Sequence, residues 1–276
     1  MSAAAPQQDL TEQFLEFYRN YYRDEIGVLA QRFPSEQQSL YIEYDDLYTY
    51  DRDIAEDYEE KPDEMRAYAE EALSLFDLPA DIDLSGANVR LTDTRDAMDS
   101  ISLAELKAER IGDFVAITGQ IEKVTKVDPN LETAHWICQR CTTPTPVEQG
   151  RNEVQQPHEC VGCERQGPFK LDPAQSDWVD QRKLKLGERP AERTTSSGQH
   201  RPVYVQGDLC HYGGENGLAD RAGEQATVLA TVNVDESSLT GKNATPDADI
   251  WLEAHSIAFE DEDLHDVNIQ AHREEF

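Results

Sequence analysis

Four cysteines stand in two C-x-x-C pairs, Cys138 with Cys141 and Cys160 with Cys163, and eighteen residues separate the pairs. This spacing lies within the range of structural zinc sites. Each pair can present two thiolates from one side, and the two pairs together complete a tetrahedron. Because a shell of four sulfurs leaves no position for a catalytic water, the pattern predicts one structural Zn²⁺ per chain that supports folding and performs no hydrolysis.

Three other uses of these cysteines compete with a four-sulfur site. Disulfides form mainly in secreted proteins, but the first ten residues contain neither an apolar run nor a basic leader. A redox C-x-x-C usually stands beside a βαβ pattern, which this sequence lacks. A site of three cysteines and one histidine stays open, since His135 and His158 flank the pairs.

A lone cysteine such as Cys210 is most often a small buried apolar residue, so we assign it no role.

The charge of the chain is strongly acidic. Its 276 residues include 56 acidic and 25 basic side chains, for a formal net charge of −31. A hydrophobic fraction of 38%, with 22 aromatic residues, argues against a disordered acidic chain. We interpret the acidity as adaptation to a salt-rich cytoplasm, because a Debye length of about 3 Å at molar salt screens self-repulsion. No apolar stretch approaches the length of a membrane span, so we expect a soluble, intracellular protein.

The elements that must position the cysteines fall into two groups. Apolar residues recur at helical spacing from Asp9 to Pro34, through 45–58, and after Pro62, with a short extended segment at 40–44 between them. After a linker near 81–85, alternation predicts strands, and Gly119 in the first strong one suggests a bend or bulge. The predicted strands cover 113–124, 169–186, 203–209, 226–234 and 250–259.

The fold class that follows is α+β: an N-terminal helical bundle, then an OB-type β-barrel with an inserted zinc ribbon. The long insertion after the first strand carries all four paired cysteines. The predicted segments are a helical domain at 1–90, the first part of the barrel at 91–133, the zinc ribbon at 134–168, the rest of the barrel with a hairpin at 169–262, and an acidic tail or linker at 263–276.

Five further motifs stand along this layout: EFYRNYYRD at 16–24, YAEEAL at 68–73, PHEC at 157–160, CERQGPF at 163–169 and DQRKLKLGE at 180–188. With these motifs, the layout resembles the N-terminal region of archaeal minichromosome maintenance (MCM) helicases, from Phe14 to about Asn268. The resemblance implies a hexameric ring that carries its zinc modules at one end and binds DNA in its central channel, ahead of an ATPase motor. It also implies a place at the nucleoid in the cytoplasm.

The sequence departs from the family pattern at informative places. It contains no G-x-x-x-x-G-K-[ST] loop, because Gly241-Lys242 is followed by Asn243, so we expect no ATP hydrolysis by this chain itself. Gly187 stands where the family usually has Gln, and Thr142 stands where a glycine follows the first cysteine pair. The chain is therefore expected to be either the front part of a helicase or a diverged standalone relative.

A basic island supplies an argument that is independent of the resemblance. Residues 181–201 hold six basic and two acidic side chains within this acidic chain. Such an island is expected where a phosphate backbone is held, although a solvated loop is the plain alternative. By resemblance, Lys123 at the end of the first strand and Lys242 at the hairpin tip join it. The predicted DNA-binding residues are Lys123, Arg182, Lys183, Lys185 and Lys242, with Trp178, Tyr204 and Trp251 as aromatics that could stack on bases.

Two functions follow, and we carry both. The first is a DNA-binding and ring-forming module of a replicative MCM helicase, which binds single-stranded DNA without sequence preference. Double-stranded DNA is a further possible ligand of the same module. The second is a standalone zinc-ribbon and OB protein that acts as a monomeric single-strand binder or regulator. A zinc enzyme is disfavoured by the closed four-thiolate shell.

Overall fold

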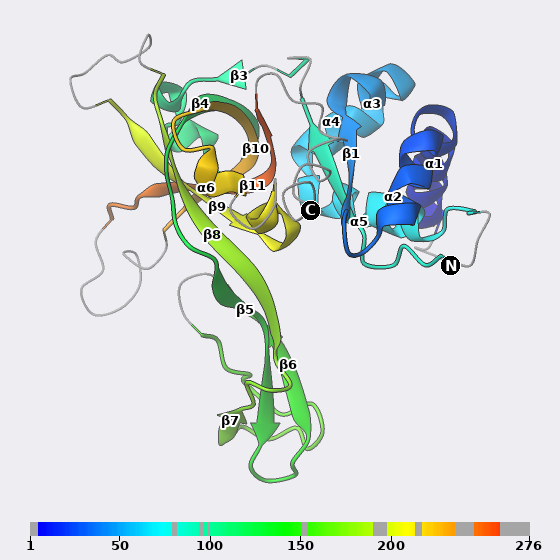
Figure 1. Ribbon diagram of the computed structural model, residues 1–276. Helices are drawn as coiled ribbons and strands as arrows, with labels where there is room; N and C mark the ends of the chain where they lie inside the picture. Colours follow the sequence, from blue (N-terminus) through cyan, green and yellow to red (C-terminus); the bar gives the residue numbers. More distant parts are fainter. Residues whose placement is uncertain are drawn as a thin grey trace, which may run out of the picture.

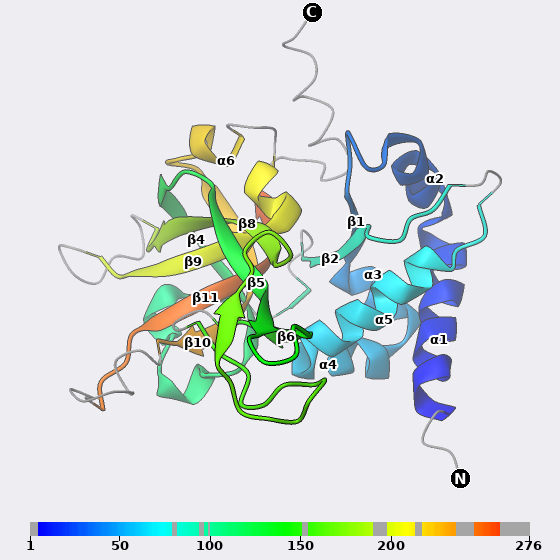
Figure 2. The same cartoon turned by 90° about the horizontal axis from the view of Figure 1, so that it is seen from below.

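The computed structural model places the helical domain beside a curved β-sheet, from which a long arm projects (Figure 1). Seen from below, the arm stands in front of the sheet, while the helices keep to one side (Figure 2). No helix in the described ranges is long and apolar enough to cross a membrane. The described residues are 5–78 (backbone only for 5–9), 82–93, 97–98, 100–150, 154–189, 198–212, 217–235 and 246–259.

The helical domain is built from more helices than the sequence predicts. The expected helix up to Pro34 is broken at Tyr22, and the one over 45–58 is broken at Asp51. The Asp51 side chain caps the new helix by accepting hydrogen bonds from the N–H groups of Asp53 and Ile54. Pro62 begins the last long helix, as predicted. The helices are α1 Ala5–Tyr21, α2 Arg23–Arg32, α3 Tyr44–Tyr50, α4 Arg52–Glu60 and α5 Pro62–Ser74.

A small parallel sheet joins the helices to the rest of the molecule. It pairs β1, Ser39–Glu43, with β2, Asn88–Thr92. Leu40 and Ile42 pack into the helical core, whereas Tyr41 between them packs into the core of the large sheet. The alternation in the sequence at 40–44 thus separates two apolar cores. Strand β2 continues across residue 90, where the sequence suggested a boundary.

The large sheet closes on itself. Its pairings run β4–β10–β11–β9–β8 and return to β4, with β9 and β11 parallel and the other pairs antiparallel. We call these five strands the closed sheet; its interior is lined by apolar residues such as Ile117, Leu184 and Val228. The strands are β4 Phe114–Val124, β8 Asp177–Gly187, β9 His200–Gln206, β10 Gln225–Val234 and β11 Ile250–Phe259.

One short strand and four short helices accompany the closed sheet in the described residues. Strand β3, Ser100–Ile101, pairs with β4. The short helices are η1 Leu103–Glu105, η2 Ala108–Arg110, η3 Gly207–His211 and α6 Gly217–Asp220.

Gly119 serves close packing and not a bulge. A Cβ at this position would lie 2.8 Å from Leu186 Cγ on the paired strand β8. The register of β4 against β8 shifts between Ile121 and Lys123, so the bulge predicted for Gly119 lies at Glu122 instead. A glycine in a strand marks either feature, and only the paired strand decides which one applies.

The arm is an insertion between β4 and β8. Strand β5, Asp128–Cys138, pairs with the first half of β8 and then with β6, Pro144–Glu148, and β7, Phe169–Leu171. The second half of β8 pairs with β4 and β9. Strand β8 therefore belongs to both the arm and the closed sheet, and it connects the cysteines to the basic island.

A buried polar seam ties the helical domain to the closed sheet. Arg90 on β2 forms a salt bridge with Asp208 and donates a second bond, of 2.9 Å, to the His255 carbonyl oxygen. Asp208 also accepts hydrogen bonds from Ser39 and Asn88. Arg90 is 7% exposed. Because both side chains are largely withdrawn from water, removal of either one would leave a buried charge without its partner.

Candidate metal centre and nucleic-acid interface

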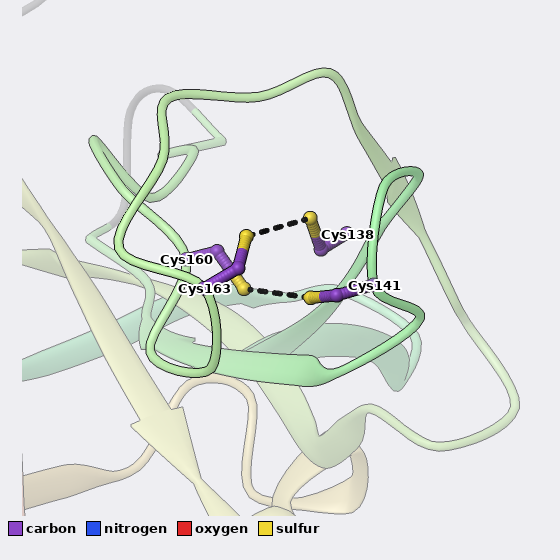
Figure 3. Close-up of side chains that lie close together, drawn as sticks. All are labelled: Cys138, Cys141, Cys160 and Cys163. Atoms are coloured by element: carbon purple, nitrogen blue, oxygen red, sulfur yellow. Dashed lines mark hydrogen bonds between the residues drawn. The ribbon is translucent and has the colours of Figure 1, made fainter.

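The four paired cysteines converge on one point at the end of the arm (Figure 3). Their sulfurs all lie within 4.8 Å of one another, with 3.9 Å between Cys138 and Cys163 and 3.5 Å between Cys141 and Cys160. A tetrahedron with Zn–S bonds of about 2.3 Å has sulfur–sulfur edges of about 3.8 Å. The donor set and its spacing therefore fit a zinc ion held by four sulfurs.

The two cysteine pairs share one backbone geometry. The Thr142 N–H donates to the Cys138 carbonyl and the Glu164 N–H donates to the Cys160 carbonyl, both at 2.9 Å. Thr142 has a φ of 62° and Glu164 a φ of 54°, in the left-handed region that favours glycine. The family glycine that Thr142 replaces thus stood at a position where the backbone requires a positive φ. The substitution adds strain but leaves the turn intact.

The thiols cannot all ionise without a cation. A hydrogen bond with the Thr143 hydroxyl lowers the pKa of the Cys141 thiol to about 6. Loss of solvation, together with the neighbouring Cys141 sulfur, raises the pKa of Cys163 to about 12. Thiolates at this spacing repel one another, whereas a divalent metal binds only the deprotonated form. The site is therefore expected to bind its metal with release of protons.

Neither flanking histidine points to the four sulfurs. His158 Nε2 lies 3.2 Å from Gln166 Nε2, and His135 Nε2 lies 3.8 Å from Asp177 Oδ2. Within the described part of the chain, the four cysteines are the group that could hold a metal ion. The geometry therefore favours four sulfurs over the set of three cysteines and one histidine. Cys210 is buried in the closed sheet, where burial raises the pKa of its thiol to about 12.

The predicted basic residues divide between the two faces of β8. Lys183 and Lys185 alternate with Leu184 and Leu186, which are buried inside the closed sheet. Arg182 shares the inward side with these leucines and is only 6% exposed. Lys123 on β4 is the direct partner of Lys185, so it lies on the same outer face. The structure therefore brings together Lys123, Lys183 and Lys185, which we call the basic strip.

The basic strip is partly neutralised. Lys185 Nζ lies 2.7 Å from Glu122 Oε2, at the bulge in β4. A Cβ at position 187 would lie 2.3 Å from Glu122 Oε1, so a side chain there would displace Glu122. This close approach gives a reason for Gly187 where the family usually has Gln. Lys242 and Arg193 lie outside the described residues.

Aromatic rings continue the outer face beside the basic strip. Lys183 Nζ lies 5.2 Å from the centre of the Tyr204 ring, and that ring meets Trp251 edge-to-face with centroids 5.5 Å apart. Trp178 is 49% exposed near the base of the arm, and its Nε1 donates to the Pro173 carbonyl. The outer face thus offers both cations and π-surfaces to a ligand that crosses it.

Sequence reasoning missed two features of this face. The inward position of Arg182 could have been found from strand alternation, since Arg182, Leu184 and Leu186 share one parity. The ion pair between Lys185 and Glu122 had no local signal, because 62 intervening residues include the whole arm. The ion pair depends on the bulge in β4 at Glu122, and only the pairing of the strands reveals that bulge.

Two family domains match the chain in succession. Residues 8–93 match the MCM N-terminal domain, and residues 102–215 match the MCM OB domain. The first segment covers the helical domain with β1 and β2, and the second begins just before β4 and ends after β9. The order agrees with the resemblance found in the sequence.

Curated relatives match over much of the chain at low identity. The minichromosome maintenance protein MCM of Saccharolobus solfataricus is 23% identical over 289 residues, which covers 98% of this chain and 40% of that protein. DNA replication licensing factor mcm6 of Dictyostelium discoideum is 23% identical over 238 residues, covering 82% of this chain and 26% of that protein. The chain thus spans less than half the length of these relatives.

A solved structure has the same fold. The crystal structure of the N-terminal domain of an archaeal MCM superposes with a TM-score of 0.67 at 22% sequence identity. The match covers 92% of this chain and 99% of that one. At this identity the likeness speaks for the fold alone.

Proposed function

Because the chain carries an MCM N-terminal domain followed by an MCM OB domain, we propose that it is the DNA-binding and ring-assembly part of a replicative MCM helicase. In this proposal it forms a homo-oligomeric ring, hexameric as in the family, with single-stranded DNA in the central channel. The observation that carries the proposal is the pair of successive domain matches over a fold of the same kind. Binding of double-stranded DNA by the same ring is compatible with it.

The four cysteines hold one structural Zn²⁺ per chain in this proposal. The sulfur positions support it, because the four sulfurs lie near the corners of a tetrahedron of the size that zinc requires. The zinc would neutralise the thiolates and fix the end of the arm. Cys138, Cys141, Cys160 and Cys163 are its ligands, and no catalytic role is assigned to it.

The basic strip supplies the contacts to DNA phosphates. Lys123 and Lys183 are exposed, and Lys185 can exchange its bond with Glu122 for a phosphate. Arg182 is buried, so we give it the task of fixing β8 and not of touching DNA. Lys242, which the resemblance places at a hairpin tip, would join the strip; it lies outside the described residues. Contacts of this kind carry no sequence preference.

The acidic surface places limits on this binding. At low salt, phosphate contacts are driven by counterion release, but that drive weakens steeply as salt rises. The charge of −31 suits a salt-rich cytoplasm. There, base stacking of about 1–3 kcal/mol per base must contribute more of the affinity. Tyr204 and Trp251 lie where a strand on the basic strip would present its bases. One subunit should therefore bind weakly, and a ring should bind more tightly through avidity.

A charge-reversal experiment tests the DNA proposal. The double variant Lys183→Glu, Lys185→Glu should lose at least tenfold in affinity for a single-stranded oligonucleotide, measured by fluorescence anisotropy across a salt series. Lys107→Glu, Lys170→Glu is the matched control, since it makes the same change of charge at exposed lysines away from the strip. If both double variants bind as the parent does, the basic island is only a solvated surface.

The oligomeric state tests the ring proposal. Six copies of a chain with charge −31 repel one another strongly in dilute buffer, whereas molar salt screens that repulsion. Light scattering should therefore detect closed oligomers at molar salt and monomers at low salt. A monomer at every salt concentration would favour the standalone single-strand binder instead.

A further inference from the structure

A groove of about 400 Å³ lies on the outer face where the arm leaves the closed sheet. This volume falls within the range of about 300–1,000 Å³ that is typical of small-ligand sites. The ring of Trp251 forms part of one wall, and the carboxylates of Glu132 and Glu253 also face the groove. Five carboxamides line it as well: Asn130, Gln149, Gln181, Gln206 and Asn233.

Strand pairing brings these amides to one surface from distant parts of the chain. Gln181 on β8 is the direct partner of Gln206 on β9, and Asn233 on β10 is the direct partner of Trp251 on β11. Directly paired residues point to the same face. Gln149 enters from the arm, where it is fixed by bonds to the backbone of Val147 and Gln155. The groove therefore joins the arm to the closed sheet.

The groove continues the basic strip. Gln181 lies two residues from Lys183 on β8, on the same outer face, and Gln206 lies two residues from Tyr204 on β9. A strand of DNA whose phosphates lie on the lysines can therefore reach the groove with its bases. Phosphates themselves are disfavoured there, because Glu132 and Glu253 would repel them.

The lining suits a planar group that both donates and accepts hydrogen bonds. A carboxamide offers two N–H donors and one carbonyl acceptor, and it carries no charge for salt to screen. A carboxylate only accepts, and it pairs with the exocyclic amino group of cytosine in known recognition. An indole ring presents a surface on which any base can stack. A nucleobase combines all of these partners.

We propose that this groove receives bases of the single strand held by the basic strip, and that its carboxylates favour bases with an exocyclic amino group over thymine. The proposal rests on the single-strand binding proposed above and adds a base preference that phosphate contacts do not have. Cytosine and adenine offer an amino group to Glu132 or Glu253. Thymine has no amino group. Its one donor, N3–H, lies between two carbonyl oxygens, and these repel a carboxylate.

The test compares oligonucleotides of equal length made of dC, dA or dT, with the full chain at molar salt, where phosphate contacts are largely screened. We expect dC and dA to bind at least about fivefold more tightly than dT, which is the lower end of one discriminating contact. Trp251→Leu should weaken all three, because it removes the stacking surface. Equal affinity for the three oligonucleotides overturns the base preference but leaves the proposed function standing. Absence of binding to all three overturns both.

Variants of the carboxylates separate base reading from plain charge. Glu132→Gln and Glu253→Gln each keep the shape of the side chain but remove the charge and add a donor. Base reading predicts that the ratio of dC to dT affinity falls toward one. Repulsion alone predicts that all three affinities rise together with an unchanged ratio, and that result overturns the proposal.

Two controls complete the design. Glu109→Gln, an exposed change on η2 outside the groove, should leave the ratio of dC to dT affinity as it is in the parent. A change of that ratio equal to the one in Glu132→Gln would overturn the proposal. Circular dichroism checks that each variant is folded. If Glu253→Gln unfolds, Glu132→Gln still decides, since Glu132 is exposed on β5.

Discussion

The helical domain and the end of the arm are stabilised in opposite ways. The helical domain buries a continuous core in which Phe14, Phe17, Tyr18, Leu29 and Leu47 are almost fully inaccessible. The arm beyond Cys138 buries almost nothing: among the described residues of 139–170, Thr145 and Cys160 alone are buried. Apolar burial of about 25 cal/mol per Å² can hold the first region together, but the second has too little of it. The proposed zinc would supply the difference.

This contrast teaches where each kind of perturbation should act. Chelation and cysteine substitution should affect the arm and spare the helices. Truncation of apolar side chains should do the reverse. The seam at Arg90 and Asp208 lies between the helical domain and the closed sheet. A substitution in the seam therefore tests how far each of the two depends on contact with the other.

The largest effect is expected from the cysteines. Cys160→Ser should abolish zinc binding and loosen residues 134–168, because structural zinc in small sites contributes about 10–16 kcal/mol. Elemental analysis and hydrogen exchange measure the two outcomes, and exchange in α1 and α5 should stay as in the parent. His158→Ala is the control and should retain the metal. Natively purified protein without zinc would refute the metal assignment.

The next largest effect is expected at the seam. Arg90→Met should destabilise the protein by about 3–5 kcal/mol, because Asp208 is then left buried without its counter-charge. Chemical denaturation followed by circular dichroism measures the loss. Arg52→Met is the matched control: its ion pair with Glu56 is exposed to solvent, so its loss should cost far less than the loss of Arg90. Equal costs for the two variants would mean that the seam contributes no more than a surface pair.

A pair of apolar truncations sharpens the comparison directly. Leu47 on α3 is fully buried, so Leu47→Ala should cost about 2–5 kcal/mol. Val161 between the cysteines of the second pair is 66% exposed, so Val161→Ala should stay within about 0.5 kcal/mol. Thermal denaturation of both variants provides the measurement. A larger cost at Val161 than at Leu47 would mean that the arm has an apolar core after all.

The last effect is a pH dependence at His255, which is the most gradual because it is spread over a range of pH. Burial lowers the pKa of His255 to about 4, and the nearby Arg66 and Arg90 lower it while Asp63 opposes them. In the unfolded state the pKa of this histidine is about 6.5, so as the pH falls the unfolded state binds a proton at a higher pH than the folded state does. The contribution of neutral His255 is complete above that value and declines as the pH falls toward 4, by at most about 1.4 kcal/mol per pH unit.

His255→Gln isolates this contribution from the other titrating groups. Denaturation of the parent and the variant between pH 7 and 4 should show a smaller loss of stability in the variant. The arm responds to acid by another route, since protonated thiols release their metal. Identical pH profiles for the two proteins would exclude His255 as the source.

Local signals predicted a large part of this molecule. The cysteine spacing predicted the convergence of four sulfurs, Pro62 predicted the start of α5, and alternation predicted β4 and the long strand β8. The family resemblance agrees with the two matched MCM domains. These features depend on residues a few positions apart, so their physics is contained in short windows of sequence.

Other features could not be predicted in that way. The sequence by itself determined that the chain would combine helices, strands and a four-sulfur centre, and that basic residues would cluster in 181–201. Only the tertiary structure decided that β1 pairs with β2, that Glu122 meets Lys185, and that five carboxamides from four strands and one loop line one groove. The physical reason is that strand register and bulges are fixed by packing between segments distant in the chain, and register decides which face each side chain occupies.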